Sequence, residues 1–421
     1  MHVMAYGTRT LRLVFFALAT LGVLPMHLHA QVSGPGTPIP RGSGARIPGS
    51  GPHLFVVDVA PGCRFSDNIQ AAVDAASDGD ILLVKPGTYA GFVIDGKSVH
   101  IFGEGSPRVD GNIEVKNVPP DRALVLRNLP LEFSYSSSFS NNASLVWVQG
   151  FRSESGLTID GTELGLFRSV VRNTRVRNGS TLVSYRSTLR GTSGDSGDGY
   201  CDGPCFYDWC YYGCDGWQWP GPGGTAVTVS SSGEFFLFGG EVRGGSGGSG
   251  NPDPCCSSSD GPGGDALRLN AGTEAVRMNA DVIPGTGSPN GQAIVGAGTI
   301  TSLSGVVCAY NISSPVISGS SATLTLVGPP GWNAFVTYST ECAPVYVPER
   351  NGYSMVDPSS DTVFVGQVPL SGTLVFTMPF SLPAGEHAAV LYSQAKFYDT
   401  AWGIAYLAEP SAVLVMRDPC P

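Results

Sequence analysis

Ala226-Val227-Thr228-Val229 and Ala266-Leu267-Arg268-Leu269 are two short strand-like segments, and the offset of 40 residues between them decides the fold. The same offset, without a gap, pairs four further positions: Glu234 with Glu274, Phe236 with Val276, Phe238 with Met278 and Val242 with Val282. A strand–turn–strand pattern that repeats at a fixed offset is typical of a solenoid, because each coil buries its apolar face on the next. We therefore predict a right-handed parallel β-helix, with a looser third copy starting at Gly291.

Short segments of the same kind occupy the chain before this repeat. Examples are Phe92-Val93-Ile94 and Leu157-Thr158-Ile159, which alternate apolar and other residues between Gly, Asp, Asn or Pro. Strands this short with no helices between them exclude doubly wound units. The composition agrees, since 57 glycines and only 14% charged residues are typical of many tight turns. The whole chain is therefore predicted to be all-β.

One helix is predicted near the start of the folded region, at Ser66–Ala76. Its apolar residues recur at helical spacing and form one face: Ile69, Ala72, Val73 and Ala76. Ser66 and Asp67 are natural N-caps, and Ser77-Asp78-Gly79 ends the helix.

This helix and the segments after it carry a family resemblance. Ile69-Gln70-Ala71-Ala72-Val73-Asp74-Ala75-Ala76, then Gly79-Asp80-Ile81 and Val84-Lys85-Pro86-Gly87-Thr88-Tyr89, resembles the opening of the pectin-lyase-like β-helix proteins. In that family such a helix plugs the first coil, whose core and strand edges would otherwise be open. The resemblance covers about residues 54–314 and implies the fold rather than an activity.

Composition divides the chain into four parts. Arg9 and Arg12 precede an apolar run that is too short to span a bilayer comfortably, which is typical of an export signal. We expect a secreted or cell-surface protein with no membrane span after cleavage. The predicted parts are a signal peptide at 1–30, a flexible linker at 31–52, the β-helix at 53–314 and a β-sandwich-like domain at 315–421. The last part resembles C-terminal β-domains of secreted bacterial repeat proteins.

Arginines concentrate in one part of this acidic chain. The net charge of −10 argues against a general nucleic-acid binder. Arg127, Arg152 and Arg175 are spaced 25 and 23 residues apart, close to one coil each, so we expect them to stack along one face. Together with Arg172 they are candidates for binding carboxylated or sulfated sugars, because guanidinium groups grip acid groups bidentately. The alternative is an ordinary solvated strand face.

Two loop insertions, at about 191–224 and 243–264, carry the remaining candidates. Trp209, Trp217 and Trp219 could form a sugar-stacking platform or the small core of the loop. Asp195, Asp198 and Asp202, with glycines between them, are candidates for wrapping a calcium ion as a cofactor. Six cysteines have no zinc-site spacing and favour disulfides of unknown pairing: Cys201, Cys205, Cys210, Cys214, Cys255 and Cys256.

Three functions remain open at this point. The preferred one is a non-catalytic extracellular protein that binds or organises polysaccharide through the arginines or the aromatic loop. The second is a calcium-assisted lyase on acidic polysaccharides, with a base among the arginines at 168–177, although no catalytic residue is identified. The third is a purely structural spacer. The fold does not choose among them, because β-helices serve many functions.

Overall fold

The computed structural model describes residues 52–418 except 61–64, 106, 121, 132–134, 198–199, 202–213, 216–218, 251–258, 351 and 357–359. At residues 200–201 and 214–215 it describes only the backbone. The expected signal peptide and linker lie outside the described residues. None of the described helices is long and apolar enough to cross a membrane.

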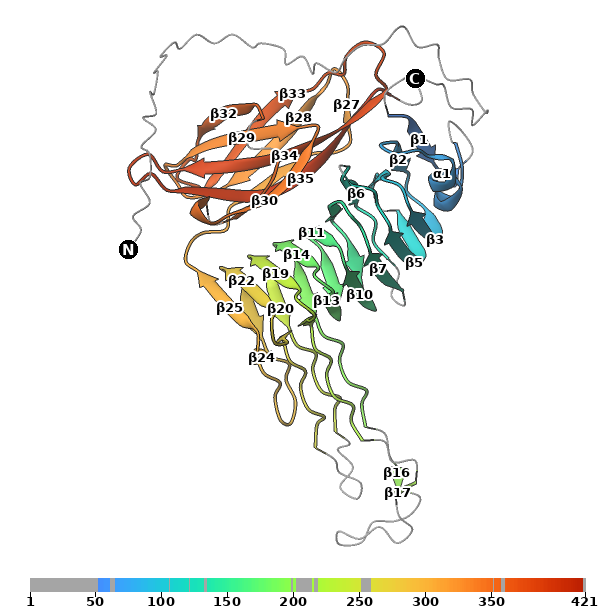
Figure 1. Ribbon diagram of the computed structural model, residues 1–421, viewed down its shortest axis with the longest axis vertical. Coiled ribbons are helices and arrows are strands. Elements are labelled where there is room, and N and C mark those ends of the chain that lie inside the picture. The colour runs from blue at the N-terminus through green and yellow to red at the C-terminus, as the bar shows by residue number, and fades with distance from the viewer. Residues whose placement is uncertain are drawn as a thin grey trace, which may run out of the picture.

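The chain is all-β, and its N-terminal two thirds form a parallel coil of three sheets (Figure 1). Sheet A has ten strands in the order β1 (Leu54–Val57), β2 (Ile81–Val84), β4 (His100–Gly103), β6 (Leu124–Arg127), β8 (Val146–Gln149), β11 (Glu163–Phe167), β14 (Thr181–Tyr185), β19 (Glu234–Phe238), β22 (Glu274–Met278) and β25 (Thr299–Leu303). Every strand pair in this sheet is parallel.

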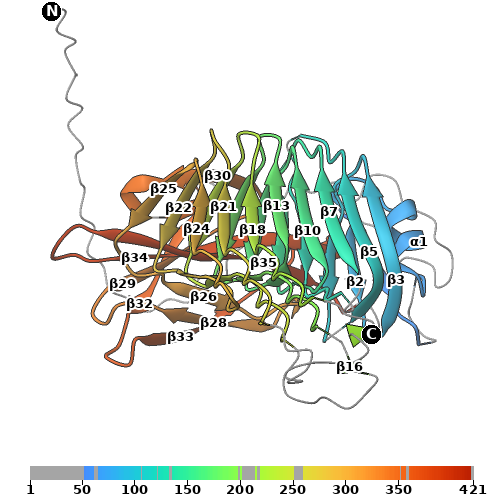
Figure 2. The ribbon, with the colours of Figure 1, turned by 90° about the horizontal axis from the view of Figure 1, so that it is seen from below.

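Two further parallel sheets complete each coil, and Figure 2 shows the strands of sheet B side by side. Sheet B contains β3 (Thr88–Asp95), β5 (Arg108–Lys116), β7 (Ser136–Ser140), β10 (Gly156–Asp160), β13 (Thr174–Arg177), β18 (Val227–Val229), β21 (Leu267–Leu269) and β24 (Ile294–Gly296). Sheet C contains β9 (Arg152–Ser153), β12 (Val170–Arg172), β15 (Thr188–Arg190), β20 (Glu241–Arg243) and β23 (Asp281–Ile283).

The fixed offset predicted from the sequence is confirmed as the register between two successive coils. Val227 pairs with Leu267 in sheet B, and Glu234 pairs with Glu274 in sheet A. Val242 pairs with Val282 in sheet C. The looser third copy is also a coil, since β24 pairs with β21 and β25 pairs with β22. The inward side chains of all these strands belong to one continuous hydrophobic core.

A single α-helix, α1 (Ile69–Ala75), lies at the N-terminal end of the described coil (Figure 2). Ile69, Ala72 and Val73 are buried in the core of the coil. Asn68 is the N-cap rather than the predicted Ser66 or Asp67, and its side chain accepts a hydrogen bond from the Ala71 amide. The helix therefore starts later than the sequence pattern indicated.

The C-terminal domain packs two sheets face to face around a second core, and all their strand pairs are antiparallel except β27 with β35. The small C-terminal sheet contains β26 (Ala309–Ile312), β28 (Ser321–Val327) and β33 (Thr373–Pro379). The large C-terminal sheet contains β27 (Val316–Ile317), β35 (Ala405–Met416), β34 (Ala388–Tyr398), β29 (Asn333–Ser339) and β32 (Thr362–Gln367). A hairpin of β30 (Cys342–Val347) and β31 (Gly352–Val356), joined through the 3-10 helix η1 (Pro348–Arg350), stands beside it.

The boundary between the two bodies falls earlier than Ser314. The last coil strand ends at Leu303, and β26 pairs antiparallel with β28 of the C-terminal domain. The sequence pattern assigned Ala309–Ile312 to the β-helix, because the longer strands of the second domain were recognised only after Ser314. Its long-range pairing with β28 decides its place instead.

The C-terminal domain covers most of the outer face of sheet A (Figure 1), whereas Glu274, Thr299 and Thr301 on the last strands stay exposed. Trp147, Phe167 and Tyr185 point outward from the coil and are fully buried against this domain. The Trp147 ring centroid lies 5.5 Å from that of Tyr392 on β34. Met355 of β31 packs over Gly165, where a Cβ would stand 3.1 Å from the Met355 methyl carbon. Sheet A is therefore sandwiched between two cores.

A glycine-rich extension leaves the coil at the corner between sheets C and B (Figure 1). It consists of five described segments: 191–197, 219–225, 244–250, 259–265 and 284–292. The amides of Gly191, Gly194 and Gly197, at every third position, donate to Arg243, Ser246 and Ser249. Polyproline-II chains have three residues per turn and leave their backbone groups free for such contacts. The predicted extruded loops thus pack on one another as extended chains.

Glycine is required in this extension by close approach of neighbouring backbones. A Cβ built on Gly245 would stand 1.8 Å from the carbonyl oxygen of Thr192. The Gly245 amide donates to Gly224 at 2.9 Å, and the Gly245 carbonyl accepts from Gly264 at 2.8 Å. Each such glycine therefore touches segments from more than one coil, and no larger residue fits.

We expect Gly245→Ala to loosen the extension while leaving the coils folded, because the added methyl group pushes adjacent chains apart at a cost of about 1–3 kcal/mol. Amide hydrogen exchange should become faster in 244–250 and 259–265. Gly156→Ala is the matched control, because a Cβ there meets nothing closer than 3.9 Å. Unchanged exchange throughout the extension in Gly245→Ala would contradict this packing.

Candidate functional site: an arginine ladder on sheet C

Sheet C carries arginines in register on three successive coils. Arg172 of β12 pairs with Arg190 of β15, and Arg190 pairs with Arg243 of β20. Neighbouring strands of a sheet lie about 4.8 Å apart, so the three residues form a closely spaced row. We call Arg172, Arg190 and Arg243 the arginine ladder. Arg190 and Arg243 directly precede Gly191 and Gly244, so the ladder lies at the base of the glycine-rich extension.

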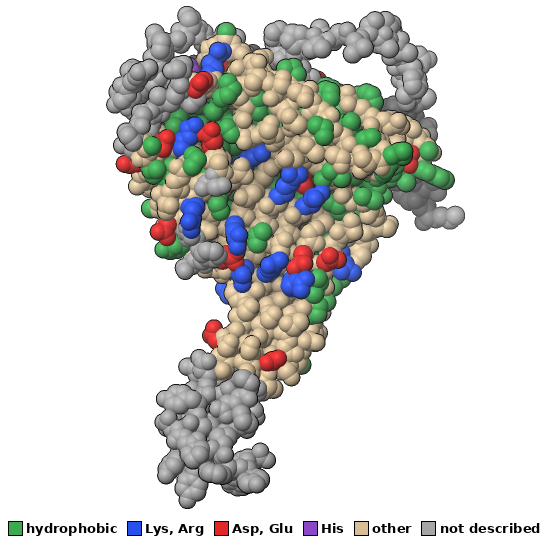
Figure 3. All heavy atoms as spheres, turned by 180° about the vertical axis from the view of Figure 1, so that it is seen from behind, with side chains coloured by type: hydrophobic (Ala, Val, Ile, Leu, Met, Phe, Trp, Pro, Cys, Tyr) green, Lys and Arg blue, Asp and Glu red, His purple; other side chains and the backbone are tan. Residues whose placement is uncertain are grey.

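The ladder is accessible to solvent. The side chain of Arg172 is 32% exposed, that of Arg190 50% and that of Arg243 46%. Arg152 of β9 flanks the row and is 55% exposed. Lys and Arg side chains, with Asp and Glu among them, appear as a band at the base of the extension in Figure 3. The sheet thus presents guanidinium groups to a ligand in solution.

Two glutamates order these arginines without neutralising them. Glu154 pairs with Arg152 and Arg172. Glu241 lies 2.8 Å from Arg243 and 3.9 Å from Arg190. Burial raises the pKa of Glu154, but hydrogen bonds from the two arginines outweigh it and lower the pKa overall. The hydrogen bond from Arg243 likewise lowers the pKa of Glu241.

The charge balance of this face is positive. The same sheet adds the exposed carboxylate of Asp281, in register with Glu241. Three acids therefore face four arginines, in a chain whose net charge is −10. Each glutamate engages only part of a guanidinium group, which has five N–H donors. Donors remain for carboxylate or sulfate groups of a ligand.

Arg127 does not belong to this face. It is 6% exposed on β6 of sheet A, where it donates hydrogen bonds to the carbonyls of Ala412 and Ile312. Burial lowers its pKa to about 10. Arg127 therefore holds the C-terminal domain against the coil.

The expected stack of Arg127, Arg152 and Arg175 is wrong, because these residues lie on sheets A, C and B. The coils in this region are shorter than the spacing of these arginines requires. One coil carries the chain only from Glu163 to Thr181, its partner in sheet A. Arg175 is exposed on sheet B, in register with Thr158 and Thr228.

Arg190 and Arg243 are members of the ladder that the sequence analysis does not select as site candidates. A sequence pattern could have identified Arg190, since Arg172 and Arg190 both end short apolar segments that lie one short coil apart. Arg190 and Arg243 are much farther apart in the sequence, because the first glycine-rich loop lies between them. The separation of Arg190 and Arg243 matches one coil only when the residues of this loop are left out of it.

The residues considered for a lyase are distributed over different faces. Asp160 pairs with Arg177 at 2.9 Å on sheet B. Glu163 of sheet A accepts a hydrogen bond from the Tyr353 hydroxyl at 2.8 Å, and burial raises its pKa. Arg168, at the end of β11, pairs with Glu409 of the C-terminal domain. The described candidates thus do not converge on one cleft.

Most loop candidates lie outside the described side chains: Trp209, Trp217, Asp198, Asp202, Cys201, Cys205, Cys210, Cys214, Cys255 and Cys256. Trp219 is described and is 72% exposed at the outer end of the extension, and Asp195 is exposed on the neighbouring segment. Backbone pairing places Cys201 opposite Cys214 in the short hairpin of β16 (Tyr200–Cys201) and β17 (Cys214–Asp215).

The residues that the structure describes contain no disulfide and no cluster of metal ligands. Cys308 and Cys342, the cysteines with described side chains, are free thiols. Within the described ranges, no three side chains of His, Cys, Asp or Glu gather as they would around a metal ion. The calcium and disulfide hypotheses for the loops stay predictions.

The fold and this site define the chain as a protein with a parallel β-helix and a C-terminal β-domain. No family model matches the chain, and no curated protein matches it.

Proposed function

We propose that the protein is an exported, non-catalytic β-helix protein that binds acidic polysaccharide along the arginine ladder. The observation that carries this proposal is the register of Arg172, Arg190 and Arg243 on three successive coils. A linear polymer with a carboxylate or sulfate on each sugar has closely spaced charges of its own. Consecutive arginines of the ladder can then each form a charge-assisted hydrogen bond with the polymer.

The rigidity of the site supports the proposal. The backbone of each arginine is held in a parallel sheet, and Val171 and Leu189, beside them, are fully buried. Glu154 and Glu241 limit the motion of the side chains. An ordered array loses less conformational entropy on binding than flexible surface side chains would.

The N-terminal sequence supports export. The segment 1–30 has the composition of a signal peptide. A protein must be exported in order to bind extracellular polysaccharide. The resemblance of the opening segment to pectin-lyase-like proteins agrees with a carbohydrate ligand. Fold alone does not assign one.

The arginine ladder is tested by its removal. We expect the triple change Arg172→Gln, Arg190→Gln and Arg243→Gln to weaken binding of oligogalacturonate at least about tenfold at low salt, since each charged hydrogen bond contributes about 1.5–3 kcal/mol. Isothermal titration calorimetry measures the loss. The affinity of the wild type should also fall as salt is added, because exposed charges are screened.

A second triple change is the matched control, because it removes the same charge from sheet B: Arg175→Gln, Arg177→Gln and Arg268→Gln. The control should bind like the wild type. Loss of binding in the control with retention in the ladder variant would move the site to sheet B. Absence of binding by the wild type to any polyuronate or sulfated polymer would favour a structural spacer. Release of unsaturated sugars, which absorb ultraviolet light, would favour the lyase.

A further inference from the structure

A cavity of about 340 Å³ opens in the C-terminal domain, away from the arginine ladder. The outward side of the large C-terminal sheet forms its floor, with Phe335 and Thr337 of β29, Thr362 of β32 and Lys396 of β34. Ser354 of β31 and Arg350 of η1 form the opposite wall.

The cavity lies where the large C-terminal sheet extends past its contact with the coil. Along one face of β34, Val390 and Tyr392 are buried against sheet A, and Gln394 binds the hairpin through the carbonyl of Tyr353. Lys396, the next outward residue of β34, lies beyond the part of the strand that contacts the coil. The hairpin and η1 stand over this part of the sheet without filling the space. The hollow is thus enclosed by elements fixed by the domain interface.

Two cations share this hollow. Burial lowers the pKa of Lys396, and the positive charge of Arg350 lowers it further. Among the residues that the structure describes, no carboxylate lies within 4.0 Å of Lys396 or Arg350, and none lines the cavity. Two like charges that face one space, with no described carboxylate paired to either, repel each other, and an anion placed between them relieves this repulsion.

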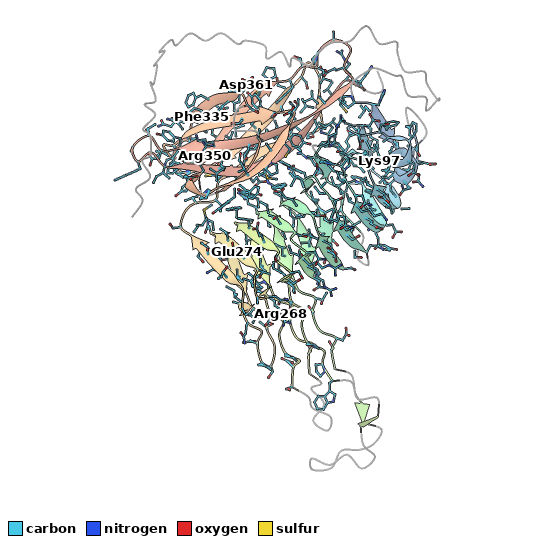
Figure 4. The ribbon with its side chains drawn as sticks, viewed as in Figure 1. Lys97, Arg268, Glu274, Phe335, Arg350 and Asp361 are labelled. Atoms are coloured by element: carbon cyan, nitrogen blue, oxygen red, sulfur yellow. The ribbon has the colours of Figure 1, made fainter. Side chains whose placement is uncertain are left out.

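The other groups around the cavity suit a polar ring. Thr337 and Thr362 present hydroxyl groups 2.9 Å apart on the floor, and the Ser354 hydroxyl lies on the wall. Phe335 adds an aromatic surface, and Figure 4 shows it near Arg350 in the same domain. Aromatic rings pack on the apolar faces of sugars, while hydroxyl groups exchange hydrogen bonds with sugar hydroxyls. A volume near the lower end of ordinary ligand pockets suits one or two sugar units.

We infer that this cavity is a binding site for a small sugar acid, whose carboxylate lies between Arg350 and Lys396 while its ring packs on Phe335. Arg350 offers two parallel N–H donors to the carboxylate, and Lys396 offers an ammonium group. The inference does not depend on the ladder, which lies on the coil and faces a polymer. The cavity would hold a single acidic sugar or the end of a chain.

Calorimetric titration of the full chain with D-glucuronate tests the inference, with D-glucose and inorganic phosphate as comparison ligands. We expect saturable binding of glucuronate, at least tenfold weaker binding of glucose, and weaker binding of phosphate, which cannot use Phe335. Lys396→Gln and, separately, Arg350→Gln should each weaken glucuronate binding at least tenfold. Arg268→Gln, which removes an exposed cation from sheet B (Figure 4), is the control and should leave binding unchanged.

Three results would overturn the inference. The first is no saturable binding of glucuronate to the wild type. The second is equal affinity in the wild type and in a folded Arg350→Gln variant; η1 lies outside the sheets, so this variant should fold, and circular dichroism checks that it does. The third is tighter binding of phosphate than of glucuronate, which would show a simple anion site rather than a sugar-acid site.

Discussion

Trp147→Ala should lower the free energy of unfolding by about 3–5 kcal/mol, the range for a fully buried large aromatic side chain. Trp147 is completely buried on the outer face of sheet A, although its side chain points away from the coil. Its ring centroid lies 4.5 Å from that of Phe167 and 5.5 Å from that of Tyr392 in the C-terminal domain. Truncation therefore opens a cavity between the two bodies.

Urea unfolding followed by circular dichroism measures this effect. Trp402→Ala is the matched control, because Trp402 is 79% exposed at the turn between β34 and β35. It should change stability by less than about 0.5 kcal/mol, as surface substitutions usually do. If Trp147→Ala were no more destabilising than Trp402→Ala, sheet A would not be covered as described.

Glu409→Gln should change how stability depends on pH. Glu409 of β35 is fully buried between the two bodies, facing Arg168 and Arg186 of the coil. Burial raises its pKa from 4.5 to about 7, although the two arginines oppose the rise. Between these pH values the folded protein holds a proton that the unfolded chain has released. The wild type therefore loses stability as pH rises from about 4.5 to about 7, by up to about 3 kcal/mol.

The variant isolates this contribution. His100 has the opposite effect, because burial lowers its pKa to about 4 and stability rises with pH as the unfolded chain loses its proton. Both proteins contain His100, so its effect cancels in the difference. The stability of the wild type minus that of Glu409→Gln should fall across pH 4.5–7 and stay level above it. A difference that rises with pH would show that Arg168 and Arg186 outweigh burial.

The coil could be predicted from the sequence because equivalent residues of two successive coils recur at a constant separation. Glu234 and Glu274 occupy equivalent places on two coils, and the backbone pairs them directly. The shorter coils before them were missed, since the assumed spacing of Arg127, Arg152 and Arg175 was too long. That error also put the arginines on one face, whereas the sheets separate them.

The covering of sheet A has a signal in the sequence. Ile81-Leu82-Leu83-Val84 is apolar at every position, and all four residues are buried. A strand with one solvated face alternates, whereas a continuous apolar run is typical of burial on both faces. What covers the second face could not be predicted, because β34 and β35 lie far away in the sequence.

The site was harder to predict than the fold for a related reason. Arg172 and Arg190 belong to one ladder through a single short coil, but Arg243 joins it only after a long glycine-rich loop is set aside. The cavity at Lys396 depends on η1 and a hairpin that fold over the sheet. Such long-range packing leaves no local pattern in the residues that line it.

Hydrogen exchange in the presence of an oligogalacturonate tests binding along the arginine ladder. We expect slower exchange in three coil segments when the ligand is added: 170–172, 188–190 and 241–243. The same amides in the ladder variant should show no change. Protection confined to sheet B, or absent from all three segments while the ligand is bound, would show that the polymer does not bind along the ladder.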